Sequence, residues 1–399
     1  MSTLLAVVHG LLLAAALLLA VPVALLLAQV LLALRPLRPM APPRAMPRPR
    51  VAVLVPAHNE ALGITATLRS IRGELAEGDR LLVVADNCTD QTAAVARSAG
   101  AEVVERHDAV ARGKGYALDF GVKHLGGAPP DVVVVIDADC TVRAGCLRVI
   151  ASLCAETQRP VQALYLMRAP EGAGLKLRIA EFAWRVKNHV RPLGYHQLGL
   201  PCQLMGTGMA FTWPQISGAK LASGHIVEDL QLGLDLAAAG RPALFCPEAQ
   251  VDSVFPTQQE GMQSQRTRWE HGHLQVIASQ LPRLLLKSVR HKDLPLLALT
   301  LDLAVPPLAL LSLLVVALCG LAGVTWGLGA SVVPLIVGLL VLAALLLAVL
   351  VAWVRVGRGV VTLRDLALAP LYALWKVPIY LGFLIGKQVE WIRSKRGPD

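Results

Sequence analysis

Hydrophobic and polar positions are spaced differently in three parts of the chain. Residues 4–34 form one long apolar run, residues 51–290 alternate short apolar runs with polar loops, and long apolar runs return at 294–321 and 332–354. A helix needs about 20 apolar residues to cross a bilayer, so each long run is long enough. The pattern predicts an N-terminal transmembrane helix over residues 1–34 and a globular domain carried between membrane segments.

A cleaved signal peptide is the alternative interpretation of the first run. The apolar part of such a peptide usually covers about 7–15 residues and follows positive charge. Here the run is longer and no basic residue precedes it, which favours a retained helix. Residues 35–50 are rich in proline and arginine and predict a stiff, extended linker.

The end of the chain, residues 291–399, predicts a C-terminal membrane domain. Its third apolar stretch, at 366–386, contains Pro370, Lys376 and Pro378 and is followed by basic residues. If that stretch crossed the membrane, the basic tail would lie on the side that loops rich in Lys and Arg avoid. We therefore expect 366–386 to be a re-entrant or interfacial segment.

Within residues 51–290 the spacing predicts an α/β domain. Short apolar runs at 51–55, 80–84, 102–105 and 132–136 are typical of buried strands, and helical patterns lie between them. Alternating strands and helices favour right-handed crossovers and a Rossmann-like, mostly parallel sheet.

Residues 160–290 are less regular, but one helical stripe stands out. Leu175, Ile179, Phe182, Val186 and Val190 share a face, and charged side chains fall elsewhere. Such a stripe packs against the core of its own domain or lies at the membrane interface. The periodicity leaves both interpretations open.

The strand at 132–136 stops abruptly at Asp137, and Asp139 follows. Two carboxylates one residue apart at the carboxyl end of a strand lie where open α/β sheets bind ligands. They suit a hard divalent cation that bridges to substrate phosphates. For the pair alone, an acidic turn is an equally good interpretation.

Three other loops are expected at the same edge of the sheet. Acidic groups there can bind ribose hydroxyls and base edges, and a lysine between glycines can meet a phosphate. The polar residues of the four loops are His58, Asn59 and Glu60, then Asp86 and Asp90, then Lys114, then Asp137 and Asp139. Singly, these are turn or cap residues; together they predict a nucleotide-binding edge.

Two later segments add candidate chemistry. A Gly-rich loop at 205–211 precedes Asp229, which is either an ordinary first-turn acid of a helix or a general base. Further on, Gln265, Arg268 and Trp269 place an amide, a guanidinium and an indole close together. An indole can stack on a sugar ring, and an arginine can neutralise a diphosphate. The alternative for this segment is a basic, amphipathic stretch near the membrane.

Composition narrows the class of protein. The 399 residues are 55% hydrophobic and 17% charged, with seven cysteines and a net charge of +10. Much of the positive charge flanks the apolar runs, which indicates anionic lipid headgroups rather than nucleic acid as the partner. The cysteines lack paired C-x-x-C spacing, so neither a zinc site nor a disulfide framework is expected.

In order, the motifs resemble those of membrane-bound family 2 glycosyltransferases, in the branch of cellulose, chitin and hyaluronan synthases. Val227 departs from the family pattern, which usually has threonine before Glu-Asp. The matching segments are Pro56-Ala57-His58-Asn59-Glu60, Asp86 to Asp90, Gly113-Lys114-Gly115, Asp137-Ala138-Asp139, Val227-Glu228-Asp229 and Gln265-x-x-Arg268-Trp269.

This resemblance implies a GT-A fold over residues 51–290, a nucleotide-sugar donor, UDP-linked in that branch, and Mg²⁺ or Mn²⁺. It implies inverting transfer of a hexosyl or N-acetylhexosaminyl group with Asp229 as base, Glu228 beside it and Asp139 on the metal. Gly206, Thr207 and Trp269 would meet the acceptor. The implied donor-binding residues are Pro56, His58, Glu60, Asp86, Lys114, Asp137, Gln265 and Arg268.

The acceptor and product remain open at this point. Few apolar runs favour a lipid or lipid-linked saccharide acceptor; a processive polysaccharide synthase is the alternative. A nucleotidyltransferase would leave residues 265–269 without a role. A non-catalytic polysaccharide-binding subunit would not need the acidic pair and Asp229. The charge of the basic linker predicts that the catalytic domain lies in the cytoplasm. We expect an integral protein of the inner or plasma membrane of a bacterium; nothing predicts the oligomeric state.

Overall fold

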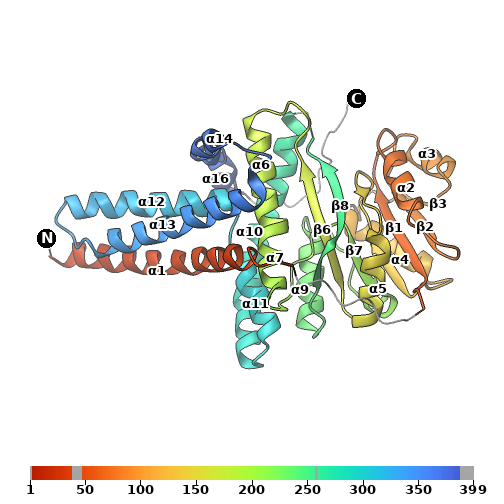
Figure 1. The fold of residues 1–399 in the computed structure, drawn as a ribbon, viewed down its shortest axis with the longest axis horizontal. Helices are drawn as coiled ribbons and strands as arrows, with labels where there is room; N and C mark the ends of the chain where they lie inside the picture. The colour runs from red at the N-terminus through yellow and green to blue at the C-terminus, as the bar shows by residue number, and fades with distance from the viewer. Residues whose placement is uncertain (1, 38–46, 257–258, 387–399) are drawn as a thin grey trace.

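The computed structural model describes residues 2–37, 47–256 and 259–386, without the side chains of 2–4, 259–265 and 384. Three long helices run side by side at one end of the molecule, and a sheet flanked by helices forms the other end. A layer of helices that run across the long ones lies between these two parts (Figure 1).

The sheet has eight strands in the order β3-β2-β1-β4-β7-β6-β8-β5. Strands β3, β2, β1 and β4 are parallel, β7 is antiparallel to β4 and β6, and β8 is parallel to β6. The predicted α/β class is confirmed, with reversed strand β7 making the sheet mixed. The strands are β1 (Val51–Ala57), β2 (Arg80–Asp86), β3 (Glu102–Arg106), β4 (Val132–Val135), β5 (Thr141–Val142), β6 (Val161–Arg168), β7 (Met209–Thr212) and β8 (Leu244–Val254).

Strand β4 lies in the middle of the sheet because all its side chains are apolar and β-branched. Val132 to Val135 are fully buried, and they pair in parallel with Val51 to Leu54 of β1. Since β1, β2 and β4 are parallel, their carboxyl ends lie at one edge. This register brings the loops after Ala57, Asp86 and Val135 to the same edge.

Helices of ordinary length cover the sheet. Gly121 in α4 touches the side chains of Leu54 and Val84, so the absence of a side chain there lets that helix lie close to β1 and β2. These helices are α2 (Ile64–Arg72), α3 (Thr92–Ser98), α4 (Lys114–Leu125), α5 (Cys146–Thr157), α8 (Trp213–Ser217) and α9 (Glu228–Ala238).

The transverse layer contains the predicted helical stripe. Ile179, Phe182, Val186 and Val190 are buried in the main core, so the core-packing interpretation is confirmed. The same layer also contacts the long helix α1. Its elements are α6 (Leu175–Arg185), a π-helical turn η1 (Val186–Val190), α7 (Arg191–His196), α10 (Gln259–Arg290) and α11 (Leu294–Leu303).

Among the described residues, three helices are long and apolar enough to cross a membrane: Leu5–Leu32, Leu308–Gly327 and Val333–Gly357. They correspond to α1 (Ser2–Leu32), α12 (Leu308–Gly327), and α13 (Val333–Ala352) with its π-helical end η2 (Trp353–Gly357). The expected span 294–321 is wrong in its bounds, because the chain breaks between α11 and α12. Pro306 and Pro307 lie at this break, where proline has no amide hydrogen to continue a helix.

After the last long helix the chain forms three short helices, α14 (Leu363–Ala367), α15 (Ala369–Trp375) and α16 (Val377–Ile385). None has the length of a membrane span, and Pro370 and Pro378 stand at the starts of the last two. The re-entrant or interfacial placement of 366–386 stays a prediction. Residues 387–399 and linker residues 38–46 lie outside the described residues.

A buried polar network joins α1 to the transverse layer. Gln29 is fully buried in α1, and its Nε2 donates to Asp302 Oδ1 over 2.7 Å. Arg191 of α7 donates to the same carboxylate oxygen over 2.7 Å and to Gln29 Oε1 over 3.2 Å. Because each buried polar group has a partner, the network fixes α1 against α7 and α11.

Candidate active site

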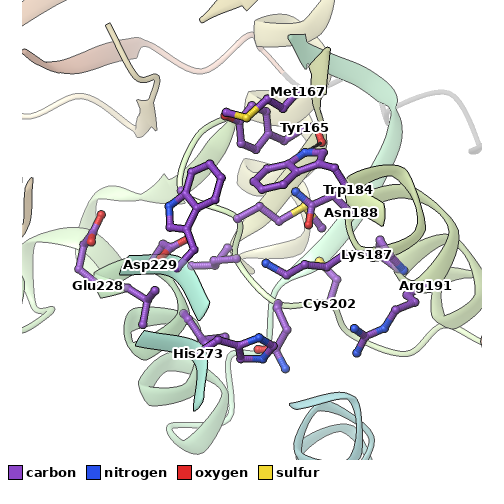
Figure 2. A pocket seen from close by; sticks show the side chains of 18 of the residues that line it. Tyr165, Met167, Trp184, Lys187, Asn188, Arg191, Cys202, Glu228, Asp229 and His273 are labelled. Atoms are coloured by element: carbon purple, nitrogen blue, oxygen red, sulfur yellow. Dashed lines mark hydrogen bonds between the residues drawn. The ribbon is translucent and has the colours of Figure 1, made fainter. Parts of the chain in front are cut away.

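A cavity of about 230 Å³ lies between the carboxyl edge of the sheet and the transverse layer. It collects residues from loops and helices that are far apart in the sequence. Figure 2 shows Glu228 and Asp229 on one side of this cavity and Lys187, Asn188 and Arg191 on the other. Of the residues expected from the sequence to form the site, the cavity is lined by Lys114, Asp137, Asp139, Gly206, Glu228, Asp229, Arg268 and Trp269.

Lys114 is the centre of the acidic half of the cavity. Its ammonium group pairs with Asp137, lies 3.7 Å from Glu228 Oε1 and donates to the carbonyl oxygen of Gly206 over 2.7 Å. Lys114 begins α4, and a side chain at the next residue, Gly115, would come within 2.7 Å of backbone oxygens of residues 221–223. Glycine is therefore needed at position 115, because the backbone of this turn lies close to the backbone of residues 221–223.

The charges of this half affect one another. Burial lowers the pKa of Lys114, but the carboxylates of Asp137 and Glu228 outweigh burial and hold that pKa above its ordinary value. Burial raises the pKa of Glu228 to about 7, although Lys114 opposes the shift. Burial raises the pKa of Asp229 as well. A carboxylate with a raised pKa is a better proton acceptor than one at the protein surface.

Asp229 is in the first turn of α9, where the helix dipole favours a negative charge. A Cβ atom at Gly206 would lie 3.3 Å from Asp229 Oδ2, and Gly206 has a φ of +95°. Only glycine adopts such a backbone conformation without strain. The Gly-rich loop thus brings its backbone directly against the predicted base.

That loop is held by Gln162, a residue of β6 that is fully buried. Its Nε2 donates to the carbonyl oxygen of Thr207 over 2.9 Å, and its Oε1 accepts from the amide of Met205 over 2.8 Å. Thr207 was expected to meet the acceptor, but it is fully buried and does not line the cavity. Its Oγ1 instead accepts from the amide of Asp137 over 3.0 Å. Because its hydroxyl is used in this way, Thr207 supports the acidic loop.

Ligand atoms of Asp137, Asp139 and Cys140 all lie within 4.8 Å of one another. Carboxylate oxygens are the preferred ligands of Mg²⁺ and also suit Mn²⁺. Burial raises the pKa of the Cys140 thiol well above its ordinary value, and the thiol contacts Asp139 Oδ1 at 3.3 Å. A neutral sulfur is a poor ligand for these cations. The donor set therefore fits a hard cation held by the two carboxylates.

An aromatic wall closes one side of the cavity. The rings of Trp184 and Trp269 have centroids 5.0 Å apart, and Tyr165 meets Trp184 edge-on at 5.3 Å. Trp184 Nε1 donates to the carbonyl oxygen of Tyr165 over 3.2 Å. Such a wall offers flat apolar faces of the kind that stack on sugar rings.

Helix α10 carries the last predicted motif. Arg268 and Trp269 both line the cavity, whereas the side chain of Gln265 lies outside the described residues. The next residue, Glu270, is buried, pairs with Lys376 and accepts from the Tyr380 hydroxyl over 3.1 Å. Helices α15 and α16 therefore hold the part of α10 that presents Arg268 and Trp269.

The expected nucleotide-binding residues lie at the same edge but do not line the cavity. His58 Nδ1 is 2.7 Å from the carbonyl oxygen of Asp86, and the Glu60 amide donates to Thr92 Oγ1 over 2.7 Å. Pro56 is the penultimate residue of β1. The Asp86 carboxylate is buried and accepts from Arg106 Nη1 over 2.6 Å. Their contacts with a nucleotide stay predictions.

Several residues of the site were not anticipated from the sequence. The unanticipated lining residues include Tyr165, Trp184, Lys187, Asn188, Arg191 and His273. From the sequence, Lys187 and Asn188 are predicted only to lie on the polar face of an amphipathic helix. Their position in the cavity follows from the π-helical turn η1, which the periodicity does not predict.

Comparison with known proteins gives a family match over residues 47–272, to the family described as "Glycosyltransferase like family 2". Over 105 residues the chain is 35% identical to a protein of Bacillus subtilis (strain 168) named "Probable glycosyltransferase YdaM". That alignment covers only 23% of this chain and 23% of the relative.

Among solved structures, a mannosyltransferase from Pyrobaculum calidifontis in complex with GDP-Man and Mn²⁺ is similar with a TM-score of 0.50 and 20% identity. The match covers 92% of this chain and 95% of that one. Glucosyl-3-phosphoglycerate synthase from Mycobacterium tuberculosis, in complex with Mg²⁺ and uridine diphosphate, has a TM-score of 0.37 and 22% identity over 56% of this chain and 79% of its own. The family match and the first structure confirm the predicted GT-A-like fold.

Proposed function

Because the chain belongs to glycosyltransferase-like family 2, we propose that it transfers a hexosyl or N-acetylhexosaminyl group from a nucleotide-sugar donor to an acceptor hydroxyl with inversion. The donor we test first is UDP-linked, as the motifs of the synthase branch imply. The similar structures include one with GDP-Man and one with uridine diphosphate. The experiment therefore compares UDP-sugars with GDP-sugars.

One observation carries this proposal: the Asp229 carboxylate shares a single cavity with Lys114 and the Asp137–Asp139 pair. A base, a phosphate-binding cation and two metal-binding carboxylates are the groups that sugar transfer from a diphosphate requires. The aromatic pair Trp184 and Trp269 supplies the face for a sugar ring at the same place.

In the proposed reaction, Asp229 accepts the proton of the acceptor hydroxyl. The hydroxyl oxygen forms a bond to the anomeric carbon from the side opposite the leaving group. The bond between that carbon and the diphosphate oxygen breaks, and the nucleoside diphosphate leaves with the electron pair. The configuration at the carbon is inverted. Burial raises the pKa of Asp229, which suits it to hold this proton.

The leaving diphosphate needs positive charge. Arg268 lines the cavity as a guanidinium that can bind it bidentately, and Lys114 adds an ammonium group. Asp137 and Asp139 would hold Mg²⁺ or Mn²⁺, whose charge would offset that of the diphosphate. Pro56, His58, Glu60, Asp86 and Gln265 are proposed to bind the nucleotide, although only the first four have described side chains.

We further propose that the protein is integral to the inner membrane of a bacterium, with the catalytic domain in the cytoplasm. The three apolar helices support insertion, and the basic residues that flank them support this orientation. The acceptor is then a lipid or a lipid-linked or other saccharide reached at the membrane surface. The QxxRW-type motif at residues 265–269 supports membership of the synthase branch.

The test uses membranes that contain the full chain, a panel of UDP- and GDP-sugars with Mg²⁺ or Mn²⁺, and release of the nucleoside diphosphate as the readout. Membranes with Asp229→Asn are the blank. We expect one donor to be consumed in an acceptor-dependent way by the wild type only. If no donor is consumed with any lipid or saccharide acceptor, the proposed activity is wrong.

Product length decides between single transfer and the processive alternative. Three candidate spans among the described residues are few helices from which to build a secretion channel. This small number favours single transfer. A single added sugar on the isolated product supports that view, and a ladder of polymer lengths supports a synthase.

A further inference from the structure

The side of the cavity that faces away from the acidic groups has features that the proposed reaction does not use. Figure 2 shows Lys187, Asn188 and Arg191 together on that side, opposite Asp229. We call Lys187, Asn188, Arg191, Tyr195, His273 and Asp302 the basic chamber, since all of them line this cavity. Its walls come from η1, α7, α10 and α11, which are all parts of the transverse layer.

Lys187 is a cation inside this chamber without a matching anion. Its side chain is exposed to the cavity space while protein surrounds the cavity. Across the described parts of the chain, it forms no ion pair within 4.0 Å, and its ammonium group lies over the Trp184 ring, 5.6 Å from the ring centroid. Burial lowers the pKa of Lys187, and the negative charge of Asp229 only partly opposes that effect. A charge in this position is stabilised when an anion enters.

Asn188 provides a second, independent sign of a ligand. The residue is only 1% exposed, and its Nδ2 has no hydrogen-bond acceptor. Buried amide donors are almost always bonded, and an exception in a cavity wall calls for a ligand acceptor. An anion beside Lys187 offers oxygen atoms that would accept from this amide.

The remaining charged groups of the chamber do not neutralise Lys187. Arg191 and Asp302 form an ion pair at 2.7 Å, so their charges cancel. Burial, together with the nearby Lys187 and Arg191, lowers the pKa of His273 to about 3, which leaves that ring neutral. Among the described residues, Lys187 is therefore the charged group of the chamber that has no ion-pair partner.

The chamber also lies next to the membrane helices. Arg191 bonds to Gln29 of α1, and the Tyr195 hydroxyl donates to the carbonyl oxygen of Ala298 in α11 over 3.1 Å. A molecule anchored among the long helices would thus have its polar head close to this side of the cavity. Strand β2, which ends at Asp86, lies at the other end of the molecule from the long helices (Figure 1).

We propose that the basic chamber binds a phosphate group of the acceptor at Lys187 and Asn188. This inference rests on the proposed function, because it names the class of acceptor: a molecule whose reactive hydroxyl reaches Asp229 while its phosphate stays in the chamber. In the reaction, the new glycosidic bond forms at that hydroxyl, its proton passes to Asp229, and the acceptor phosphate keeps all its bonds. The phosphate belongs either to a lipid-linked acceptor or to a soluble phosphorylated one.

The test measures binding and needs no sugar transfer. The full chain in detergent is titrated with farnesyl phosphate, with inorganic phosphate and with farnesol, and tryptophan fluorescence reports binding because Trp184 stands beside Lys187. We expect farnesyl phosphate to bind and farnesol not to bind. Tighter binding of farnesyl phosphate than of inorganic phosphate assigns a lipid source, and equal binding assigns a soluble phosphorylated acceptor.

Variants connect this binding to the chamber. Lys187→Gln should weaken phosphate binding by about tenfold or more, since a charge-assisted bond is lost, and Lys187→Arg should retain it. Lys176→Gln is the matched control: this lysine of α6 stacks on Trp375 at 4.4 Å and does not line the cavity. Phosphate binding by Lys176→Gln should stay within about twofold of the wild type, because this variant removes a positive charge outside the cavity.

Three results would overturn the proposal. The first is unchanged phosphate binding in Lys187→Gln, and the second is equally tight binding of farnesol. The third is loss of phosphate binding in Arg268→Ala but not in Lys187→Gln, which would assign the phosphate to the donor half. Should no nucleotide sugar be consumed by the wild type, the proposed function fails separately, and the binding data still decide whether the chamber is a phosphate site.

Discussion

The ammonium group of Lys114 donates to the carbonyl oxygen of Gly206 over 2.7 Å and so joins the start of α4 to the Gly-rich loop. The same ammonium group pairs with Asp137. One lysine therefore holds together the Gly-Lys-Gly turn, the acidic pair and the loop that touches the predicted base. This arrangement leads to specific expectations for activity.

Replacing Arg268 by alanine should slow sugar transfer by about 10²–10³-fold, the usual effect of removing one preorganised charge-stabilising group. The reason is that Arg268 lines the cavity, where we propose that its guanidinium offsets the charge of the leaving diphosphate. The measurement is kcat for donor consumption. Arg241→Ala is a suitable control, since that residue is exposed in the segment that follows α9. Near-normal turnover of the Arg268 variant would contradict the assigned role.

Gly206→Ala should impair catalysis more than stability. An alanine at this position would have to keep a backbone φ of +95°, and its Cβ would lie 3.3 Å from Asp229 Oδ2. Gly240→Ala is a matched control because Gly240 has a φ of +80° and open space around it. Both variants should lose about 1–2 kcal/mol of unfolding free energy through the left-handed backbone. Only the Gly206 variant should lose activity, and equal activity of the two would contradict the close placement of the base.

The rate should depend on pH because Asp229 must be deprotonated to act as a base. Burial raises the pKa of Asp229 above its ordinary value. We therefore expect kcat/KM to fall as the pH drops through this raised pKa, because the base is then protonated. Lys114 and Lys187 lower the pKa of Asp229, whereas Asp137 raises it.

Glu228→Gln tests this coupling. Removing a negative neighbour makes the charged form of Asp229 easier to reach, so the acidic limb of the pH profile should move to lower pH. Asp235→Asn, in the same helix but exposed, should leave the limb in place. A limb that stays put or moves upward in Glu228→Gln means that another group controls the profile.

A chelator should abolish sugar transfer, and added Mn²⁺ or Mg²⁺ should restore it. In Asp139→Asn, much more metal should be needed for half-maximal rate, because one of two charged oxygen ligands is lost. Cys140→Ala should keep the wild-type metal requirement, since a thiol is a poor partner for these cations. Full activity of the wild type in the chelator would remove the metal from the proposed reaction.

The buried pair of Glu270 and Lys376 should be important for stability. Lys376→Met leaves Glu270 buried without its cation and should cost about 3–5 kcal/mol. The double variant Glu270→Leu with Lys376→Met should recover much of that loss, because no charge then stays buried. Thermal unfolding in detergent measures both. Lys123→Met breaks an exposed pair with Asp119 and should cost about 1 kcal/mol or less; a similar loss in Lys376→Met would contradict the buried pair.

Sequence patterns were sufficient to predict the strands of one half of the sheet. Strands β1, β2 and β4 consist of apolar runs that end at polar loops, and this predicts both their burial and the edge at which Asp137 appears. The other half was not predicted. Strand β6 contains Gln162, a polar side chain in the core that the Gly-rich loop requires as a partner, and such a partner is visible only in three dimensions.

The site shows the same division. Lys114, Asp137, Asp139 and Asp229 belong to motifs, so their chemistry could be inferred before their positions were known. Lys187 belongs to no motif, and its place depends on one π-helical turn. A local change of helix type moves side chains around the axis, which residue spacing alone cannot reveal.

The bonds from Gln29 and Arg191 to Asp302 also have a consequence for the order of synthesis. The ribosome makes Gln29 first, Arg191 later and Asp302 last, so the wall of the cavity lacks its counter-charge until α11 has emerged. A buried guanidinium without a counter-charge disfavours the native arrangement of α7. The cavity therefore reaches its final form only when the part of the chain that leads into α12 has been made, and a chain that stops before this point lacks the ion pair of Arg191 with Asp302 in the cavity wall.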